Sequence, residues 1–243
     1  MSLPRFFINN LLAPGASVDL PPEVAHHASH VLRLKQDDEV RLFDGRGGEW
    51  AAHIVRLKPT LHVALDSFDP ASHAPDLRVT LVQALPAADK MDWVVQKAVE
   101  LGIAVIQPVV AKRSVVRLSG EKLARRQIHW RNVAVAACEQ CGANVVPVIA
   151  PLLDLPRYLS QTATENELRL LLLPEATARL RDLSRPDGAV TLLIGPEGGF
   201  DEGEIEIAAF AGFKPLSFGP RVLRTETAGP AVLAAMMTQW GDC

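Results

Sequence analysis

Two glycine- and proline-rich segments carry the residues whose types and spacing could do chemistry. Residues 194–199 and residues 219–228 each follow an apolar run. Such loops leave backbone N–H and C=O groups exposed at the carboxyl end of a buried strand, which is where open α/β sheets bind ligands. The second segment adds Arg224 and Glu226, which have opposite charges, beside Thr225 and Thr227. The two loops predict an enzyme that holds one small ligand between them.

Residues around the first loop restrict the ligand. The loop lacks the spacing of a dinucleotide fingerprint and the Lys-Ser/Thr ending of a phosphate-binding loop. Asp201, Glu202 and Glu204 open the next helix, where they suit the positive end of its dipole and repel phosphate. An uncharged, zwitterionic or cationic ligand is therefore favoured. A well-capped β-to-α connection would explain one loop about as well, but it explains two similar loops less well.

The elements that must position these loops alternate between apolar runs and helical patterns. Strands are expected at residues 79–85, 105–110, 145–149, 168–173, 190–194 and 214–218. An amphipathic helix is expected over 90–101, and a helix that is apolar on nearly all sides over 229–240. This alternation predicts an α/β domain with a mostly parallel sheet covered by helices on both faces.

The first 66 residues indicate a small β-rich module. Strand-like runs at 39–43 and 49–55 are joined by a glycine-rich turn, and a third alternating run covers 61–68. A short amphipathic helix is expected over 22–34. Residues 69–76 are small, polar and proline-bearing, which is typical of a linker. The sequence thus predicts two domains, 1–70 and 71–243.

Composition limits the class of protein. The chain has 243 residues, 48% of them hydrophobic, and a formal net charge of −3, which fits one large or two modest globular domains. No uninterrupted apolar run reaches the roughly 18 to 20 residues that cross a bilayer, so we expect a cytoplasmic protein without membrane contact. Three cysteines without a secretion signal favour reduced thiols.

Basic residues gather in two places. Residues 112–131 hold seven Lys or Arg against one acid, and the β-rich module adds more. Phosphate backbones bind such fields by counterion release, with His129 and Trp130 available for stacking. A solvated helix face would explain one such cluster equally well. Two basic regions on separate modules favour a long anionic partner.

Metal and redox sites are disfavoured. Cys138 and Cys141 form a C-x-x-C near the end of a helical pattern, and no second pair at similar spacing accompanies them. His26, His27 and His30 lie at helical spacings, but a third ligand and a glutamate base are lacking. We expect an ordinary helix with polar histidines, and no metal.

Several motifs together resemble one enzyme family. Ile-Gly-Pro-Glu-Gly-Gly at 194–199 and Gly-Pro-Arg-Val-Leu-Arg-Thr-Glu-Thr-Ala at 219–228 resemble the paired cofactor loops of the ribosomal RNA small subunit methyltransferase E family, a branch of the SPOUT methyltransferases. Residues 5–7, 30–33 and 44–47 are similar to that family's PUA-like module. Residues 96–102, 113–114 and 138–140 are similar to its catalytic domain. The resemblance covers nearly the whole chain.

The resemblance implies a fold, a cofactor and partners. The fold is a SPOUT-type knotted parallel-sheet methyltransferase domain, with a carboxyl-terminal trefoil knot, preceded by a small PUA-like β-barrel that binds RNA. The cofactor is S-adenosyl-L-methionine, which leaves as S-adenosyl-L-homocysteine. The reaction is methylation of uracil nitrogen 3 at uridine 1498 of 16S ribosomal RNA in the small ribosomal subunit. The knotted domains pack as a homodimer.

The resemblance also implies site residues. We expect Arg224 to stabilise the negative charge of deprotonated uracil, and Glu226 to orient Arg224 or act as base. The expected cofactor-binding residues lie in or near the loops: Leu173, Pro174, Ile194, Gly195, Pro196, Glu197, Gly198, Gly199, Leu216, Phe218, Gly219, Leu223, Arg224, Thr225, Thr227 and Ala228. The expected RNA-binding residues are basic: Arg5, Arg33, Arg46, Lys97, Arg113, Arg117, Arg125 and Arg126.

One departure from the family concerns RNA affinity. The family usually has an arginine shortly after the Glu-Gln pair, whereas this chain has Ala143 in that region. If that arginine helps to hold RNA, Arg113 and Arg117 are the available substitutes.

Three alternatives remain at this point. A small-molecule α/β enzyme would explain the loops but would leave the basic residues of the β-rich module without a role. A SPOUT enzyme that methylates the ribose 2′-hydroxyl of rRNA or tRNA would need the same basic surface and cofactor loops. A non-catalytic ribosome assembly factor could keep the fold, although the presence of Arg224, Glu226 and both loops argues against it.

Overall fold

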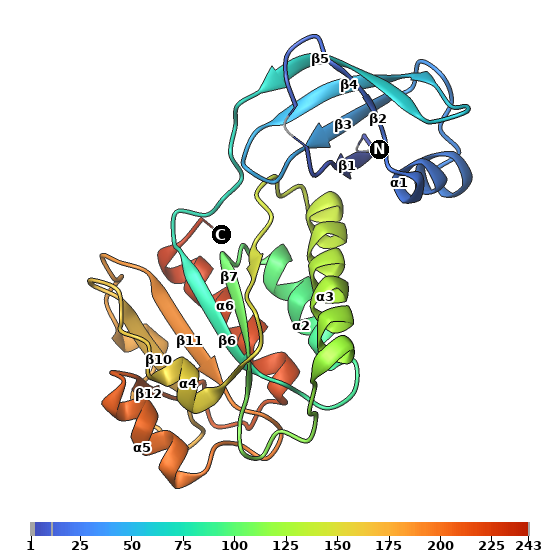
Figure 1. Ribbon diagram of the computed structural model, residues 1–243. Helices are drawn as coiled ribbons and strands as arrows, with labels where there is room; N and C mark the ends of the chain where they lie inside the picture. Colours follow the sequence, from blue (N-terminus) through green and yellow to red (C-terminus); the bar gives the residue numbers. More distant parts are fainter. Residues whose placement is uncertain (1–2, 11, 243) are drawn as a thin grey trace. The chain divides into compact units, whose positions relative to one another are not determined.

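The chain forms two compact units in a computed structural model that describes residues 3–10 and 12–242 (Figure 1). The first unit contains the chain up to Ala74 together with Cys138–Val146, and the second contains Pro75–Ala137 and the chain from Pro147 onward. The sequence predicted a single boundary at residue 70, whereas the first unit is built from two separate segments of the chain. The return of Cys138–Val146 to the first unit depends on tertiary contacts, among them a bond from the Val146 amide to the Gly45 carbonyl (3.2 Å).

The first unit is a curled sheet of five strands in the order β1-β3-β4-β5-β2. Its elements are β1 (Arg5–Phe7), β2 (Ser17–Asp19), α1 (Pro22–His26), a π-helical turn (His27–Val31), β3 (Glu39–Phe43), β4 (Glu49–Arg56) and β5 (His62–Asp69). Alternate residues of β4 are buried, as the period of a half-buried strand requires. Phe6, Leu42, Ile54 and Val63 pack in its core.

The second unit contains a seven-stranded sheet in which all strand pairs are parallel. The order is β12-β10-β11-β6-β7-β8, and β9 also pairs with β7. The strands are β6 (Val79–Ala84), β7 (Val105–Val110), β8 (Val148–Ile149), β9 (Leu153–Asp154), β10 (Leu168–Leu172), β11 (Val190–Ile194) and β12 (Lys214–Leu216). The prediction of an α/β domain with a parallel sheet is confirmed.

Helices cover both faces of this sheet (Figure 1). They are α2 (Lys90–Glu100), α3 (Gly120–Cys141), α4 (Leu155–Leu159), α5 (Glu202–Phe210) and α6 (Thr225–Trp240), with a 3-10 turn at Leu180–Asp182. Val82, Leu171 and Leu193 pack with α4 and α5 on one face. On the other face α6 packs on β6 and β11 and against α2. The sheet is therefore buried on both faces, which explains why its strands are mostly apolar.

Three elements differ from their predicted bounds by three or more residues at one end. The amino-terminal helix ends at Val31, and Arg33 adopts a positive φ of 56°. Of the strand expected over 145–149, only Val148–Ile149 pairs in the sheet. Helix α6 begins at Thr225, four residues before the predicted start, and Pro230 lies inside it. The missing N–H of an interior proline removes one backbone hydrogen bond, so the packing of α6 on β6, β11 and α2 must keep the helix continuous.

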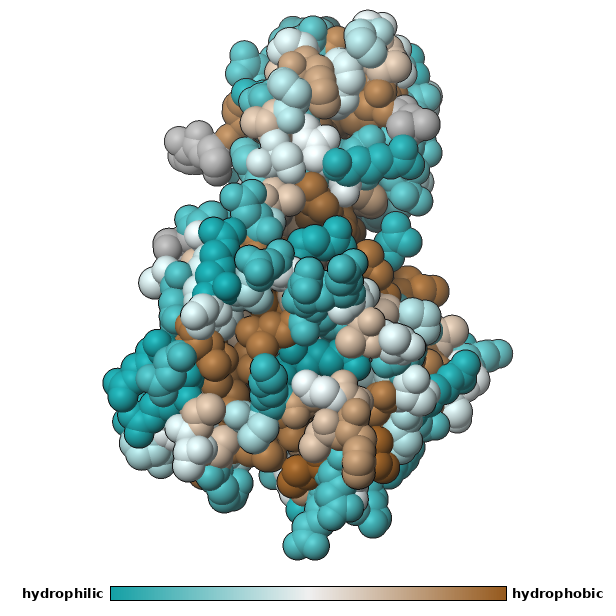
Figure 2. Space-filling model, turned by 90° about the vertical axis from the view of Figure 1, so that its left-hand side faces the viewer, coloured by the Kyte–Doolittle hydropathy of each residue, from teal (hydrophilic) through white to brown (hydrophobic). Residues whose placement is uncertain are grey.

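The surface mixes polar and apolar residues. In Figure 2, apolar side chains lie between hydrophilic ones on the face toward the viewer. Across the described part of the chain, no helix combines the length and apolar character that a membrane span requires.

Candidate active site

A cavity of about 920 Å³ opens in the second unit beside the carboxyl ends of β10, β11 and β12. The loop after β11 and the loop after β12 both line it. Cavities of roughly 300–1,000 Å³ hold small ligands, and open α/β sheets place them at this edge. The structure thus brings the two glycine-rich segments together around one cavity, as the sequence predicts.

Two glycines leave space for a ligand. Gly199 and Gly219 have φ angles of +65° and +84°, a region that other residues rarely adopt. A Cβ placed on either glycine would meet no protein atom within 4 Å, and both residues line the cavity. The backbone at these two positions is therefore open to a ligand at close range.

Arg113 and the start of α5 hold the first loop. Arg113 donates from Nη1 to the carbonyls of Gly198 (2.9 Å) and Phe200 (3.2 Å). Asp201 and Glu204 form a capping box at the amino end of α5. Lys112 bonds Asp201 (2.5 Å), which raises the pKa of Lys112 and lowers that of Asp201. These contacts hold the loop at Gly198 and Phe200 and at the start of α5.

Lys90 joins the first loop to α6. Its ammonium lies 3.0 Å from Oε1 of Glu197 and 3.4 Å from Oε1 of Glu226. The hydrogen bond to Glu197, followed by that to Glu226, raises the pKa of Lys90. Burial would raise the pKa of Glu197, but the Ala87 amide and Lys90 outweigh it and lower that pKa. Lys90 therefore stays charged between two carboxylates.

The two proposed catalytic residues differ in their surroundings. Glu226 has a side chain that is 15% exposed, and its Oε2 is buried without a hydrogen-bond partner. Arg224 is exposed and lines the cavity, and over residues 3–10 and 12–242 no bond or ion pair engages its guanidinium. The ion partner of Glu226 is Lys90. The expectation that Glu226 orients Arg224 therefore stays a prediction.

Most residues expected to bind the cofactor line the cavity. These are Leu173, Pro174, Ile194, Gly195, Pro196, Glu197, Gly198, Gly199, Phe218, Gly219, Leu223, Arg224, Thr225 and Ala228. Leu216 is fully buried in β12, and neither it nor Thr227 is in the lining.

The sequence prediction also missed lining residues, among them Lys90, Glu175, Phe200, Glu202 and Arg221. Lys90 follows the carboxyl end of β6, so the edge-of-sheet rule applied to every strand would have found it.

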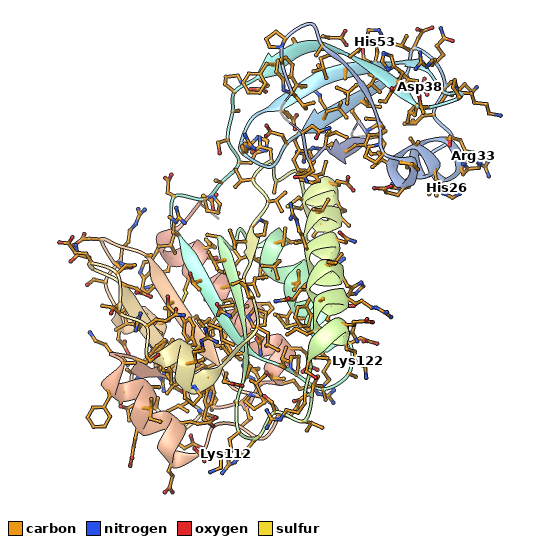
Figure 3. The ribbon with its side chains drawn as sticks, viewed as in Figure 1. His26, Arg33, Asp38, His53, Lys112 and Lys122 are labelled. Atoms are coloured by element: carbon orange, nitrogen blue, oxygen red, sulfur yellow. The ribbon has the colours of Figure 1, made fainter. Side chains whose placement is uncertain are left out.

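The basic residues expected to bind RNA fall into two groups. Arg33 and Arg46 are exposed, and over residues 3–10 and 12–242 no hydrogen bond or ion pair engages their guanidinium groups. Figure 3 shows Arg33 just after the helical segment of the first unit, which ends at Val31. Arg125 is exposed but pairs with Glu121 (3.0 Å). The other five are also engaged within their own unit. Arg5 pairs with Glu49 (3.0 Å) and donates to the Ala143 carbonyl (3.2 Å), Lys97 pairs with Glu100, Arg113 holds the glycine loop, Arg117 donates to the Ala111 and Lys112 carbonyls, and Arg126 pairs with Asp89. Their RNA contacts stay predictions.

Cys138 has little thiolate character. Its side chain is fully buried, and burial raises the pKa of its thiol to about 12. Cys141 is exposed, and both cysteines are free. Among residues 3–10 and 12–242, no cluster of three or more His, Cys, Asp or Glu side chains could hold a metal ion.

Comparison with known proteins places the chain in a family. A family model described as an RNA methyltransferase domain matches residues 73–237, and one described as an RNA methyltransferase PUA domain matches residues 20–64. The ribosomal RNA small subunit methyltransferase E of Buchnera aphidicola subsp. Schizaphis graminum is 31% identical, over 99% of this chain and 98% of that protein. That of Synechocystis sp. is 32% identical, over 90% of this chain and 72% of that protein.

Two solved structures share the whole fold. A methyltransferase from Legionella pneumophila, in complex with bound SAM, has a TM-score of 0.95 and 36% identity over 100% of both chains. A ribosomal RNA small subunit methyltransferase E from Neisseria gonorrhoeae, bound to S-adenosyl methionine, has a TM-score of 0.92 and 36% identity over 99% of both chains. Full-length similarity to these proteins and a domain match over most of the sequence show that this chain belongs to the ribosomal RNA small subunit methyltransferase E family.

Proposed function

We propose that this protein methylates nitrogen 3 of uridine 1498 in 16S ribosomal RNA of the small ribosomal subunit, using S-adenosyl-L-methionine. The observation that carries the proposal is the cavity walled by both glycine loops in a chain of this family. Relatives that carry the methyltransferase name, and family members solved with the methyl donor bound, support it.

The cavity suits this cofactor. Its volume of about 920 Å³ fits a nucleoside joined to an amino acid. Leu173, Phe218 and Leu223 offer apolar contacts, while the open backbone at Gly199 and Gly219 offers polar ones. The lining holds charges of both signs, with Glu175, Glu197 and Glu202 among the acids and Lys90, Arg113, Arg221 and Arg224 among the bases. Such a lining suits a ligand that carries both a cationic sulfonium and an anionic carboxylate.

Positioning should supply much of the rate. The bound cofactor supplies an activated methyl group, and the attacking nitrogen must approach it in line with the breaking carbon–sulfur bond. Well-oriented reactants gain up to roughly 7–11 kcal/mol over free encounter. The glycine loops, held by Arg113 and by Lys90, provide this orientation.

The uracil must also lose its imide proton. Its pKa lies about two to three units above neutrality, so deprotonation costs about 3 to 4 kcal/mol. Arg224 lines the cavity with an unengaged guanidinium, which suits it to stabilise the uracil anion. Glu226 lies outside the cavity lining, and its buried Oε2 has no partner. Its assignment as the base, which would contribute roughly 10² to 10⁴ in rate, therefore requires the uracil to reach that oxygen. The methyl group then joins nitrogen 3, and the sulfur leaves as a neutral thioether.

RNA recognition is assigned to the basic residues. Arg33 and Arg46 are exposed and can meet phosphates directly, and Arg125 is exposed but must leave its ion pair with Glu121 to do so. A homodimer of the carboxyl-terminal domain, with a trefoil knot in each copy, completes the proposal.

Methylation of ribosomal subunits tests the function. Small subunits from cells that lack their own enzyme would be incubated with the protein and labelled S-adenosyl-L-methionine, and the product nucleoside identified by mass analysis. We expect 3-methyluridine at position 1498. A 2′-O-methylated nucleoside would replace the proposal with ribose methylation. Absence of cofactor binding in calorimetry would replace it with a non-catalytic assembly factor.

A further inference from the structure

A fully buried glutamine lies beneath the cavity. Gln83 is the fifth residue of β6, in a strand whose other buried side chains are apolar, and it is 0% exposed. Its Nε2 donates to the Ala84 carbonyl (3.0 Å) and to Oγ1 of Thr225 (3.0 Å). Its Oε1 is buried without a partner. An unsatisfied buried oxygen destabilises a fold, so this residue needs an explanation other than packing.

The partners of Gln83 determine the direction of each hydrogen bond. The Ala84 carbonyl can only accept, so the amide nitrogen must face it, and the same nitrogen reaches Thr225. Oγ1 of Thr225 therefore accepts from Gln83, and its single proton is directed to the Gly195 carbonyl at 2.5 Å. The hydrogen bond from Gln83 thus orients the Thr225 hydroxyl toward the Gly195 carbonyl.

This chain of bonds joins the two cofactor loops. Gly195 opens the loop after β11, and Thr225 is the first residue of α6 after the second loop. Both residues line the cavity, although 30 positions separate them in sequence. A Cβ on Gly195 would lie 3.1 Å from the Phe200 ring, so the loop is also packed closely from its other side. The Thr225 hydroxyl therefore links the second loop directly to the first.

We propose that Gln83 is a positioning residue that orients the Thr225 hydroxyl and so keeps the two loops in the arrangement that binds S-adenosyl-L-methionine. The inference rests on the proposed function, because it concerns the same cofactor site. Side chains behind a site often set its affinity by holding the contacting groups in place. Such residues are kept at a cost to stability, which explains the unpaired Oε1.

The neighbouring strand supplies a matched control. Gln107 on β7 is 7% exposed, and its Nε2 also donates to the next residue's carbonyl, that of Pro108 (2.8 Å). Its second bond goes to the Pro151 carbonyl (2.8 Å) instead of to a cavity residue. The two glutamines share residue type and sheet, and both are buried. They differ in that second partner and in the buried, unpaired Oε1 of Gln83.

The test compares Gln83→Met with Gln107→Met. Binding of S-adenosyl-L-methionine would be measured by calorimetry, and stability by urea unfolding. We expect Gln83→Met to bind roughly tenfold more weakly than the wild type, as loss of one hydrogen bond implies, with an equal or higher urea midpoint. Gln107→Met should bind like the wild type. In Thr225→Val, which lacks the hydroxyl, adding Gln83→Met should weaken binding no further.

Three results would overturn the inference. They are wild-type affinity in Gln83→Met, an equal loss in Gln107→Met, and additive losses in the double variant. If Gln83→Met does not fold, Thr225→Val decides alone, because unchanged affinity there would exclude a role for the hydroxyl. Absence of cofactor binding by the wild type would instead remove the proposed function itself.

Discussion

The two ends of strands β10 and β11 use their polar groups differently. At the amino ends, Thr191 donates to Glu167 (2.5 Å) and Arg169 lies 3.3 Å from Glu167. The Arg169 and Glu167 side chains are only 7% and 8% exposed. At the carboxyl ends, the cavity holds the unengaged Arg224, and Glu226 beside it has an unpartnered oxygen. Polar groups that the protein pairs internally should contribute to stability, and those left open should contribute to binding and chemistry.

The largest effect should come from breaking the buried pair. Arg169→Met leaves Glu167 buried without its cation, and we expect a loss of about 3 to 5 kcal/mol in the free energy of unfolding. Urea unfolding measures it. Protein that remains folded should bind S-adenosyl-L-methionine like the wild type, and weakened binding would show that the two ends of the sheet are coupled.

Removing the unpaired guanidinium of Arg224 should lower the methylation rate and leave the stability of the fold unchanged. Arg224→Ala should lower single-turnover methylation by roughly 10² to 10³, the usual cost of removing one preorganised charge stabiliser. Its urea midpoint should stay unchanged because the guanidinium has no partner within the described chain. Full methylation with normal cofactor affinity would remove Arg224 from the mechanism.

Lys90 lies between these two extremes. Its side chain is paired and is 32% exposed. Lys90→Met should reduce the methylation rate roughly tenfold, because Glu197 and Glu226 lose the cation between them, and Lys90→Arg should restore part of it. The control Lys214→Met removes an exposed lysine outside the cavity lining, and it should keep the wild-type rate. An equal loss of rate in both variants would mean that the net charge of the protein matters, rather than the contacts of Lys90 with Glu197 and Glu226.

The smallest effect concerns acid stability. Burial alone would raise the pKa of Glu167, but hydrogen bonds from Thr191 and Thr164 and the charge of Arg169 outweigh it and lower that pKa below 4.5. Because the folded-state pKa is lowered, this stabilisation is present above pH 4.5 and is lost as pH falls through the lowered value. Glu167→Gln should flatten the decline in unfolding free energy below that pH. An unchanged slope would assign acid sensitivity to other carboxylates.

Sequence patterns predicted the strongly periodic elements and missed the short or interrupted ones. The bounds of β7 and β11 match the prediction because each is a short, mostly apolar run, followed by Ala111 and Lys112 in one case and by Gly195 in the other. Strands β1 and β2 have three residues each, too few to show alternation. The start of α6 was placed too late because Gly229 and Pro230 indicate a break, whereas packing on β6, β11 and α2 keeps the helix intact.

The sequence by itself determined which loops form the candidate site, because glycine, proline and paired charges after buried strands are local signals. It could not show that Lys90 lies between Glu197 and Glu226, or that Gln83 reaches Thr225 from a strand 142 positions away. Those contacts exist only once parallel strands from distant parts of the chain end at one edge. The tertiary structure therefore decided which charges are paired, which polar atoms stay open, and which residue behind the cavity holds its loops.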